Sequence, residues 1–265
     1  MFLKSGDFGF RLFGFISTVL IVLPLSAYGT IYLVAADPAS HSVGIAAISS
    51  GHVVSNVPHA MNGVKGIGFT GWSGSVANVN PAMDKRVFEL MSQSVPADQI
   101  AAFVDSQIHE KYSRYIFIST QGPMGYVFPP HGCAEPECGV KVSGTGQFFV
   151  MGGGLKHDVV PNTVQIYEKI HPRTDLPFEC KLLAGLQTII NVGGEVKEFN
   201  EAGIAIDQPG QPQQVWFKST SVREPQIIAN LHSQIAKSGI NCPALRQAEP
   251  LQQKPRRESG SLDLN

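Results

Sequence analysis

The position of Thr30 in the chain could make its hydroxyl group a nucleophile. A threonine hydroxyl is a weak nucleophile and needs a base within hydrogen-bonding distance. If the chain is cut between Gly29 and Thr30, the new α-amino group becomes that base on the same residue. This amine titrates at about 7.7 to 8.0 in model peptides, so a useful neutral fraction exists at neutral pH. An attack on an acyl group would also need backbone N–H donors for the oxyanion, and Gly152-Gly153-Gly154 is the candidate segment.

The first 29 residues have the order of a cleavable secretory signal. Lys4 and Arg11 precede an apolar run over 12–23, and Pro24 then leads to Ala27-Tyr28-Gly29. The run is shorter than the roughly 20 apolar residues that a membrane-spanning helix needs, so we expect no stable membrane span after processing. A cut after Gly29 places small residues at both positions that the peptidase inspects. The segment therefore predicts a periplasmic or secreted protein that begins at Thr30.

Four cysteines, all in the part expected to be exported, predict disulfides, because the exported compartments are oxidising. Three pairings are open to Cys133, Cys138, Cys180 and Cys242. Cys133 and Cys138 could instead form half of a zinc site beside His131, but their spacing is not that of a two-residue zinc knuckle. The other two cysteines show no knuckle of their own. A local disulfide with a loop histidine is the preferred interpretation, and no metal or organic cofactor is implied.

Composition limits the classes of partner. The 20 Lys and Arg residues are balanced by 21 Asp and Glu, so no basic field exists for nucleic acid. The 27 Gly and 18 Pro beside 15% charged residues predict many tight turns in an ordered chain. We expect one domain over 30–243, followed by a polar, disordered tail over 244–265. A homo-oligomer is left open.

The chain pattern predicts alternating blocks of strands and helices. A buried hairpin is expected from 30–36 and 43–49 around the turn at Asp37-Pro38, with a third strand at 66–72. Two amphipathic helices follow at 81–94 and 97–109. Further strands are expected at 115–119, 125–128, about 147–151, 203–206 and 214–217, and further helices at 162–170, 176–192 and about 224–237. This order predicts an α+β fold, a four-layer αββα sandwich of two stacked, mainly antiparallel sheets, with a β-sandwich carrying inserted helices as the alternative.

The segment from Thr30 to Ser49 resembles the opening of the bacterial family called domain of unknown function 1028. Members of that family begin with a similar Thr-containing strand, an Asp-Pro turn and a Gly-Val-Ala-Val strand that ends near a serine. Other similar segments follow in family order, at 56–60, 63–71, 77–82, 95–100, 144–153 and 193–206. The resemblance spans roughly 30 to 217. It implies the fold and chemistry of the N-terminal-nucleophile (Ntn) hydrolase superfamily, to which the family is assigned.

The resemblance also suggests residues that could assist Thr30. Ser49 and Asn80 match family positions and could orient Thr30 or a substrate. Their structural alternatives are a strand-end hydroxyl for Ser49 and a helix cap before Pro81 for Asn80, and for Asn80 we prefer the cap. Lys65 could supply a cation near Thr30 if its loop folds inward, with a surface lysine as the alternative.

Three departures from the family pattern change the polar residues expected around Thr30. Met151-Gly152-Gly153 stands where the family has Gln-Gly-Asn, so Gly152 and Gly153 are left as the oxyanion or substrate candidates. Phe199-Asn200-Glu201 stands where a basic residue and a Gln-Ser pair are expected, and Ser50 replaces a lysine.

Two hypotheses follow. The first is an exported hydrolase that cleaves an amide or related acyl bond of a small-molecule or peptide-like substrate through Thr30. The second is a non-catalytic binding or envelope-associated protein that keeps the fold.

Overall fold

The computed structural model describes residues 30–50, 61–73, 81–108, 114–127, 138–194, 198–220 and 224–243. Predictions about the signal segment 1–29, the tail 244–265, Asn80, His131 and Cys133 lie outside these residues. Within the described ranges, no helix is both long enough and apolar enough to cross a membrane.

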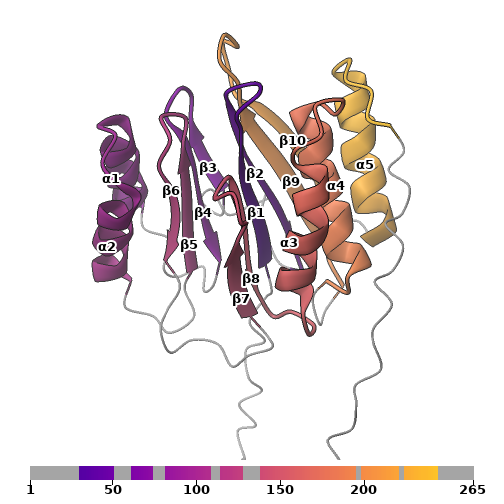
Figure 1. The fold of residues 1–265 in the computed structure, drawn as a ribbon, viewed down its shortest axis with the longest axis horizontal. Coiled ribbons are helices and arrows are strands. Elements are labelled where there is room, and N and C mark those ends of the chain that lie inside the picture. Colours follow the sequence, from indigo (N-terminus) through magenta and orange to yellow (C-terminus); the bar gives the residue numbers. More distant parts are fainter. Residues whose placement is uncertain are drawn as a thin grey trace, which may run out of the picture.

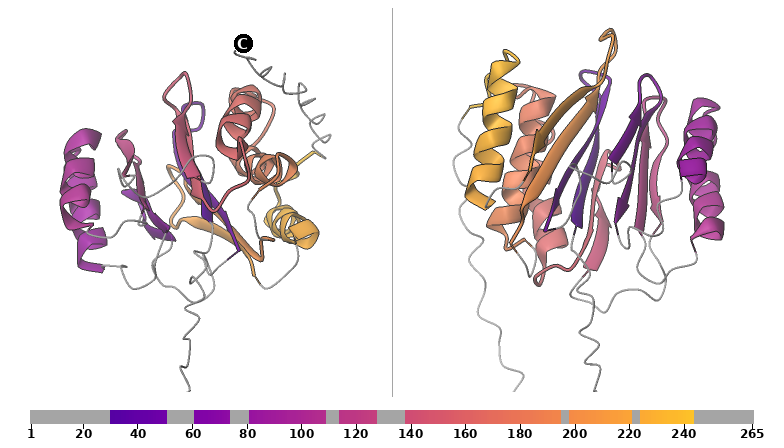
Figure 2. Two further views of the ribbon diagram at one scale, coloured as in Figure 1. Left: turned by 90° about the horizontal axis from the view of Figure 1, so that it is seen from below. Right: turned by 180° about the vertical axis from the view of Figure 1, so that it is seen from behind.

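Four layers are stacked in the described part of the chain (Figures 1 and 2). The strands are β1 (Thr30–Asp37), β2 (Ser42–Ser49), β3 (Met61–Val64), β4 (Gly68–Ser73), β5 (Arg114–Ser119), β6 (Met124–Val127), β7 (Cys138–Val142), β8 (Phe148–Gly153), β9 (Glu201–Asp207) and β10 (Val215–Ser219). The helices are α1 (Pro81–Ser92), α2 (Ala97–Gln107), α3 (Val159–Ile170), α4 (Phe178–Asn191) and α5 (Glu224–Lys237). Helices α1 and α2 cover one outer face, and α3, α4 and α5 cover the other. The predicted αββα sandwich is confirmed.

The two sheets are antiparallel throughout their described pairs. The first has the strand order β10-β9-β2-β1-β8-β7, and the second has the order β3-β4-β5-β6. The predicted hairpin of β1 and β2 lies at the centre of the first sheet, so each of its strands has a neighbour on both sides. Thr30 is therefore the first residue of a central strand.

The apolar residues form three clusters, one in each gap between layers. One cluster lies between the six-stranded sheet and helices α3, α4 and α5, and includes Ile31 and Leu33. A second lies between the sheets and includes Tyr32 and Val34. The third lies between the four-stranded sheet and helices α1 and α2. Successive residues of β1 alternate between the first two clusters, as the period of a strand requires.

Two short strands at sheet edges were not predicted from the sequence. Strand β3 is Met-Asn-Gly-Val, and β7 is Cys-Gly-Val-Lys-Val. Gly, Asn and Lys have low strand propensity, and a short edge strand shows little alternation. Their partners β4 and β8 decide their conformation through pairing. Tertiary contacts therefore define these two edges.

Two glycines let helix α4 approach the central hairpin closely. A Cβ on Gly185 would lie 2.2 Å from Cδ2 of Leu33, and a Cβ on Gly44 would lie 2.6 Å from Cδ1 of Leu182. Real Cβ atoms do not come this close to another heavy atom. The missing side chains thus let α4 press against β1 and β2, which fixes the strand that begins at Thr30.

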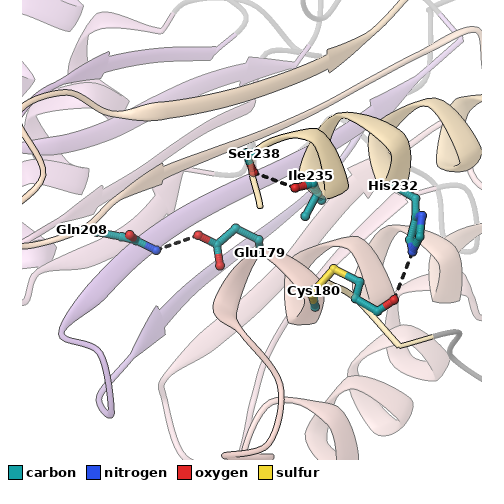
Figure 3. Close-up of a disulfide and its surroundings, with 7 residues drawn as sticks. Glu179, Cys180, Gln208, His232, Ile235 and Ser238 are labelled. Carbon is teal, nitrogen blue, oxygen red and sulfur yellow. Dashed lines mark hydrogen bonds between the residues drawn. A yellow bond between two sulfur atoms is a disulfide. The ribbon is translucent and has the colours of Figure 1, made fainter. Parts of the chain in front are cut away.

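A disulfide joins Cys180, in the first turn of α4, to Cys242, which follows α5 (Figure 3). The two Cα atoms are 5.3 Å apart, and the two residues are 62 positions apart in sequence. A ring nitrogen of His232 forms a hydrogen bond of 3.1 Å with the carbonyl oxygen of Cys242. Cys138 is also disulfide-bonded, whereas the remaining cysteine, Cys133, lies outside the described residues. The disulfides expected from the sequence are present, and the pairing left open there includes Cys180 with Cys242.

The far end of β1 is held by buried charged groups. Lys181 Nζ lies 3.0 Å from Asp37 Oδ1, and Ser40 donates a hydrogen bond of 2.6 Å to Asp37 Oδ2. Burial raises the pKa of Asp37, but the hydrogen bonds from Ser40 and Lys181 lower it by more, so the pKa lies below its usual value. A ring nitrogen of His171 forms a hydrogen bond of 2.9 Å with the Ala36 carbonyl oxygen, and burial holds the pKa of His171 below its usual value. Asp37 therefore does more than close the turn.

Candidate active site

Thr30 and Ser49 meet across the central hairpin. They are directly opposite each other in the pairing of β1 with β2, and their hydroxyl oxygens are 3.0 Å apart. Both side chains are buried, with exposed fractions of 7% for Thr30 and 1% for Ser49. Ser49 thus lies where it can orient the Thr30 hydroxyl, as the sequence suggested. In the full chain Thr30 follows Gly29 through a peptide bond, so its nitrogen is an amide until that bond is cut.

The hydroxyl groups of this pair face the space between the two sheets. Alternate residues of a strand point to the same face, and Tyr32 of β1 belongs to the apolar cluster between the sheets. Thr30 has the same parity as Tyr32. On β2, Ala47 belongs to that cluster as well, and Ser49 has the parity of Ala47. The Thr30–Ser49 pair therefore lies between the two sheets, at a polar end of this otherwise apolar cluster.

Thr30 lies within a row of residues that crosses the six-stranded sheet. Cross-strand pairing places Glu201 of β9 opposite Ser49, and Gly153 of β8 opposite Thr30. Neighbouring strands are about 4.8 Å apart. Glu201 has the parity of Ala205, which lies between the sheets, and it is only 2% exposed. The order across the sheet is therefore Glu201, Ser49, Thr30 and Gly153, with a carboxylate at one side of the hydroxyl pair.

Arg114 reaches this row from the other sheet. It is the first residue of β5, it is 6% exposed, and its parity matches Ile116, which lies between the sheets. A Cβ built on Gly153 would lie 2.1 Å from Nη2 of Arg114 and 2.3 Å from its Cζ and Nη1. The guanidinium therefore occupies the space that a side chain at Gly153 would fill. Since Gly153 is directly opposite Thr30, the guanidinium lies over the strand next to Thr30, on the face of the sheet that carries the Thr30 hydroxyl.

Sequence reasoning missed Arg114. One feature of the sequence could have revealed it: Arg114 is two residues before Ile116 and four before Ile118, so it points to the same face of the strand as these apolar residues. Such a position predicts a buried charge, and buried charges are concentrated at functional sites. Which residues it would meet depended on the packing of two sheets and could not be seen in the sequence.

A buried hydrogen-bonded cluster supports β4 and β5 next to Arg114. Asp84 of α1 accepts hydrogen bonds of 2.6 Å from Tyr115 Oη and 3.3 Å from Trp72 Nε1. Tyr32 in turn donates a hydrogen bond to the Trp72 carbonyl oxygen. Burial raises the pKa of both tyrosines well above the usual value, so both stay protonated as donors. The cluster links helix α1, both sheets and the strand that carries Thr30.

Gly152 and Gly153 have different surroundings. A Cβ on Gly152 would lie 3.0 Å from Cγ1 of Ile31, on the helix-covered side of the sheet, whereas Gly153 faces Arg114. Strand β8 pairs with β1 and β7, so its backbone N–H groups point along the sheet toward those neighbours. This geometry gives both glycines a packing role, and an oxyanion role for their N–H groups stays a prediction.

Lys65 does not reach Thr30. Its ammonium group forms a salt bridge with Asp207 and donates a hydrogen bond of 2.7 Å to the carbonyl oxygen of Gln208. Asp207 and Glu201 are the two ends of β9, a strand of seven residues that spans about 20 Å. The expected cation near Thr30 is therefore not Lys65, because the turn between β3 and β4 folds against the opposite end of the sheet. Arg114 occupies the position for which Lys65 was considered.

The other departures from the family pattern separate into core and site residues. Phe199 is 1% exposed and packs in the cluster beneath α3, α4 and α5, so it is a core residue. The Asn200 N–H donates a hydrogen bond of 3.0 Å to the Ser49 carbonyl oxygen, which fixes the end of β2. Ser50 is buried directly after that strand. Of this group, Glu201 faces the same gap as the Thr30 hydroxyl.

A cavity of about 650 Å³ lies near the site but on the opposite side of the sheet. It is bordered by β7 and the start of α3, including Gly139, Leu155 and His157. Thr30 is not among the residues that line it. Within the described ranges, no group of three His, Cys, Asp or Glu side chains is arranged to hold a metal ion.

Comparison with known proteins agrees with the layered fold and with the segment that begins at Thr30. The model of a family of unknown function, domain of unknown function 1028, matches residues 30–226. The chain therefore belongs to this family. The crystal structure of a protein of the same family from Silicibacter pomeroyi has a TM-score of 0.63 and 17% sequence identity, with 80% of this chain and 87% of that chain covered. That similarity concerns the fold. No curated protein matches the sequence.

Proposed function

We propose that this protein is an exported N-terminal-nucleophile hydrolase that cleaves an amide or related acyl bond through Thr30. The observation that carries the proposal is the position of the Thr30 hydroxyl. It begins a central strand, faces the gap between the sheets, and lies 3.0 Å from the Ser49 hydroxyl. The family match also begins at residue 30, the residue that the predicted signal cleavage would expose.

Signal cleavage after Gly29 would complete this site. It turns the amide nitrogen of Thr30 into an amine, which supplies a base next to the hydroxyl. The Arg114 guanidinium lies over Gly153 on the neighbouring strand β8, and a nearby positive charge favours the neutral form of an amine. The disulfide between Cys180 and Cys242 supports export, since disulfides persist in oxidising compartments.

The reaction would proceed in two balanced steps. The Thr30 oxygen attacks the carbonyl carbon while the α-amine takes the hydroxyl proton, and the proton then passes to the leaving amine as the C–N bond breaks. The product is an acyl ester on Thr30. A water molecule, deprotonated by the same amine, attacks this ester, releases the carboxylic acid and returns the proton to the Thr30 oxygen. Ser49 orients the nucleophile through its hydrogen bond.

A second candidate function, a non-catalytic binding or envelope-associated protein, is favoured by one observation. Thr30 is only 7% exposed in the full chain, and its hydroxyl is already hydrogen-bonded to Ser49. A nucleophile must be reached by the substrate. The two candidates therefore differ in whether removal of the preceding segment opens the Thr30 hydroxyl.

Labelling of the exported protein distinguishes the two candidates. N-terminal sequencing should give Thr30 as the first residue, and a panel of acylating probes should label that residue. Thr30→Ala should abolish the labelling, Ser49→Ala should slow it, and Thr145→Ala, which changes an exposed threonine in the β7–β8 turn, should leave it unchanged. A mature protein that starts elsewhere, or one that starts at Thr30 and resists every probe, would assign the binding role instead.

A further inference from the structure

A second cavity lies on the outer side of the four-stranded sheet, between helix α1 and the edge strand β3. Met61 of β3 belongs to the apolar cluster between the sheets, so Asn62 and Val64, which have the opposite parity, face α1 instead. Both of these residues line the cavity, together with one side of α1. The volume is about 440 Å³, which is within the range of small-molecule sites. The four-stranded sheet separates this cavity from the gap that Thr30 faces.

Asp84 is a buried carboxylic acid in the wall of this cavity, with an exposed fraction of 4%. Its Oδ1 accepts hydrogen bonds of 2.6 Å from Tyr115 Oη and 3.3 Å from Trp72 Nε1. Its Oδ2 accepts a hydrogen bond of 2.6 Å from Asn62 Nδ2. A carboxylate can accept about four hydrogen bonds. One position therefore remains on Oδ2, next to Asn62, which lines the same cavity.

Two features favour the ionised form of Asp84. It lies in the first turn of α1, where the helix dipole favours a negative charge. Burial raises the pKa of Tyr115, and the negative charge of Asp84 raises it further. The three groups that donate hydrogen bonds to Asp84 are neutral, and Asp84 forms no ion pair with any residue of the described ranges. Because a buried charge without a partner is costly, the wall of the cavity favours a cation.

The other charged groups that line the cavity lie toward solvent. Lys85 is exposed on α1, and Glu89 is half-exposed and forms a salt bridge of 2.9 Å with Arg86. Charges in water are screened, whereas a buried charge acts through a low dielectric constant. Asp84 therefore determines the electrostatic preference of the inner part of the cavity.

The arrangement of donors around Asp84 limits the kind of cation that fits. A guanidinium group pairs best with both oxygens of a carboxylate at once. Tyr115 and Trp72 already occupy Oδ1, so this two-point pairing is blocked. An ammonium group needs only one oxygen. Val64 and Phe88 add apolar surface to the lining, so an apolar chain next to the ammonium group would be buried there.

We propose that this cavity binds a small organic cation, a primary ammonium group attached to an apolar chain. The ammonium group donates a hydrogen bond to Asp84 Oδ2, and the chain contacts Val64 and Phe88. An alcohol with the same chain keeps the apolar contacts but loses the ion pair, and a carboxylate with that chain is repelled by Asp84. The inference does not depend on the function proposed for Thr30, because the two sites lie on opposite faces of the four-stranded sheet.

Hexylamine, hexanol and hexanoate test the proposal, because they share one apolar chain and differ in charge. Hexylamine is protonated at pH 7, since alkylamines such as the lysine side chain titrate at about 10.4. The purified ¹⁵N-labelled protein is titrated with each compound, and the indole N–H signals are followed by NMR. The chain has two tryptophans, and Trp72 Nε1 donates to Asp84, whereas Trp216 lies on β10. A Trp216→Phe protein assigns the two signals.

Hexylamine should shift the Trp72 signal and leave the Trp216 signal unchanged. We expect it to bind about 10- to 100-fold more tightly than hexanol, as for a hydrogen bond between charged groups. Asp84→Asn should reduce its affinity to that of hexanol, because the amide keeps the size of the side chain without its charge. Asp105→Asn is the matched control, since Asp105 is exposed on α2. This variant should keep the full preference for hexylamine.

A second pair of variants tests the cavity without changing Asp84. Val64→Trp enlarges a side chain that lines the cavity and is 37% exposed, so it should fill part of the space and weaken the binding of both hexylamine and hexanol. Val142→Trp is its control, because Val142 is 43% exposed on β7 and does not line the cavity. This pair decides the result if Asp84→Asn fails to fold, as judged by its thermal unfolding midpoint.

Four results would overturn the proposal. Hexylamine and hexanol could bind equally well, or hexylamine could leave the Trp72 signal unchanged. The preference for hexylamine could persist in folded Asp84→Asn, or its affinity could stay the same in Val64→Trp. Tightest binding of hexanoate would also overturn it, because that result assigns the cavity to anions through Lys85.

Discussion

Adding one methyl group at Gly153 should disturb both the stability and the chemistry of the Thr30 site. In Gly153→Ala the new Cβ would lie 2.1 Å from Nη2 of Arg114, whereas ordinary contacts begin at about 3.4 Å. The guanidinium must therefore move by roughly 1.3 Å, the difference between these distances. Strand β8 is paired on both sides, so the arginine moves more readily than the backbone.

The expected loss of stability follows from two opposing effects. Forcing an extra methyl group into a packed space costs about 1–3 kcal/mol. Replacing glycine with alanine also restricts the unfolded chain, which stabilises the protein by about 0.4–1 kcal/mol. Gly153→Ala should therefore lower the free energy of unfolding by about 1–2 kcal/mol. Displacement of Arg114 should also slow the acylation of Thr30.

Gly139→Ala is the matched control on the neighbouring strand. A Cβ there would meet Val160 at 4.0 Å, an ordinary contact, so we expect no loss of stability. Urea unfolding of both variants, repeated in an Arg114→Ala background, gives the coupling energy between positions 153 and 114. Without the guanidinium, the cost of Gly153→Ala should largely disappear. A Gly153→Ala protein as stable as Gly139→Ala, or one with the same cost in both backgrounds, would refute the packing proposed for Arg114.

Three further predictions concern the rest of the domain. Lys181→Met should lower the free energy of unfolding by about 3–5 kcal/mol, because Asp37 would stay buried without its cation, and adding Asp37→Asn should recover much of this loss in urea unfolding. His171 is held neutral by burial, so its contribution to stability should be complete above about pH 6.5. That contribution should decrease as the pH falls from there toward the lowered pKa, and a His171→Gln protein should lose this part of the pH dependence of unfolding. Reducing the disulfide between Cys180 and Cys242, whose loop spans 62 residues, should cost about 4 kcal/mol, measured by urea unfolding with and without reductant.

The regular elements followed from local patterns. The central hairpin, the helices of both covering layers and most strands were predicted because their periods of apolar residues are clear. The edge strands β3 and β7 were not predicted, since short segments with glycine and polar residues acquire their conformation from a neighbouring strand. Lys65 was considered as a cation near Thr30, but it pairs with Asp207 at the opposite end of the sheet. The direction in which its turn folds is set by contacts between residues distant in sequence.

The sequence by itself indicated Thr30 as the candidate nucleophile, because Thr30 directly follows the predicted cleavage site. It also determined the order of layers, because each apolar period specifies which face an element buries. Only the tertiary structure decided which groups surround Thr30. Ser49, Gly153 and Arg114 come from three other strands in two sheets, and their meeting depends on strand register and sheet stacking. The same reason applies to the pairing of Cys180 with Cys242, since a contact between distant residues leaves no mark in the local pattern of either.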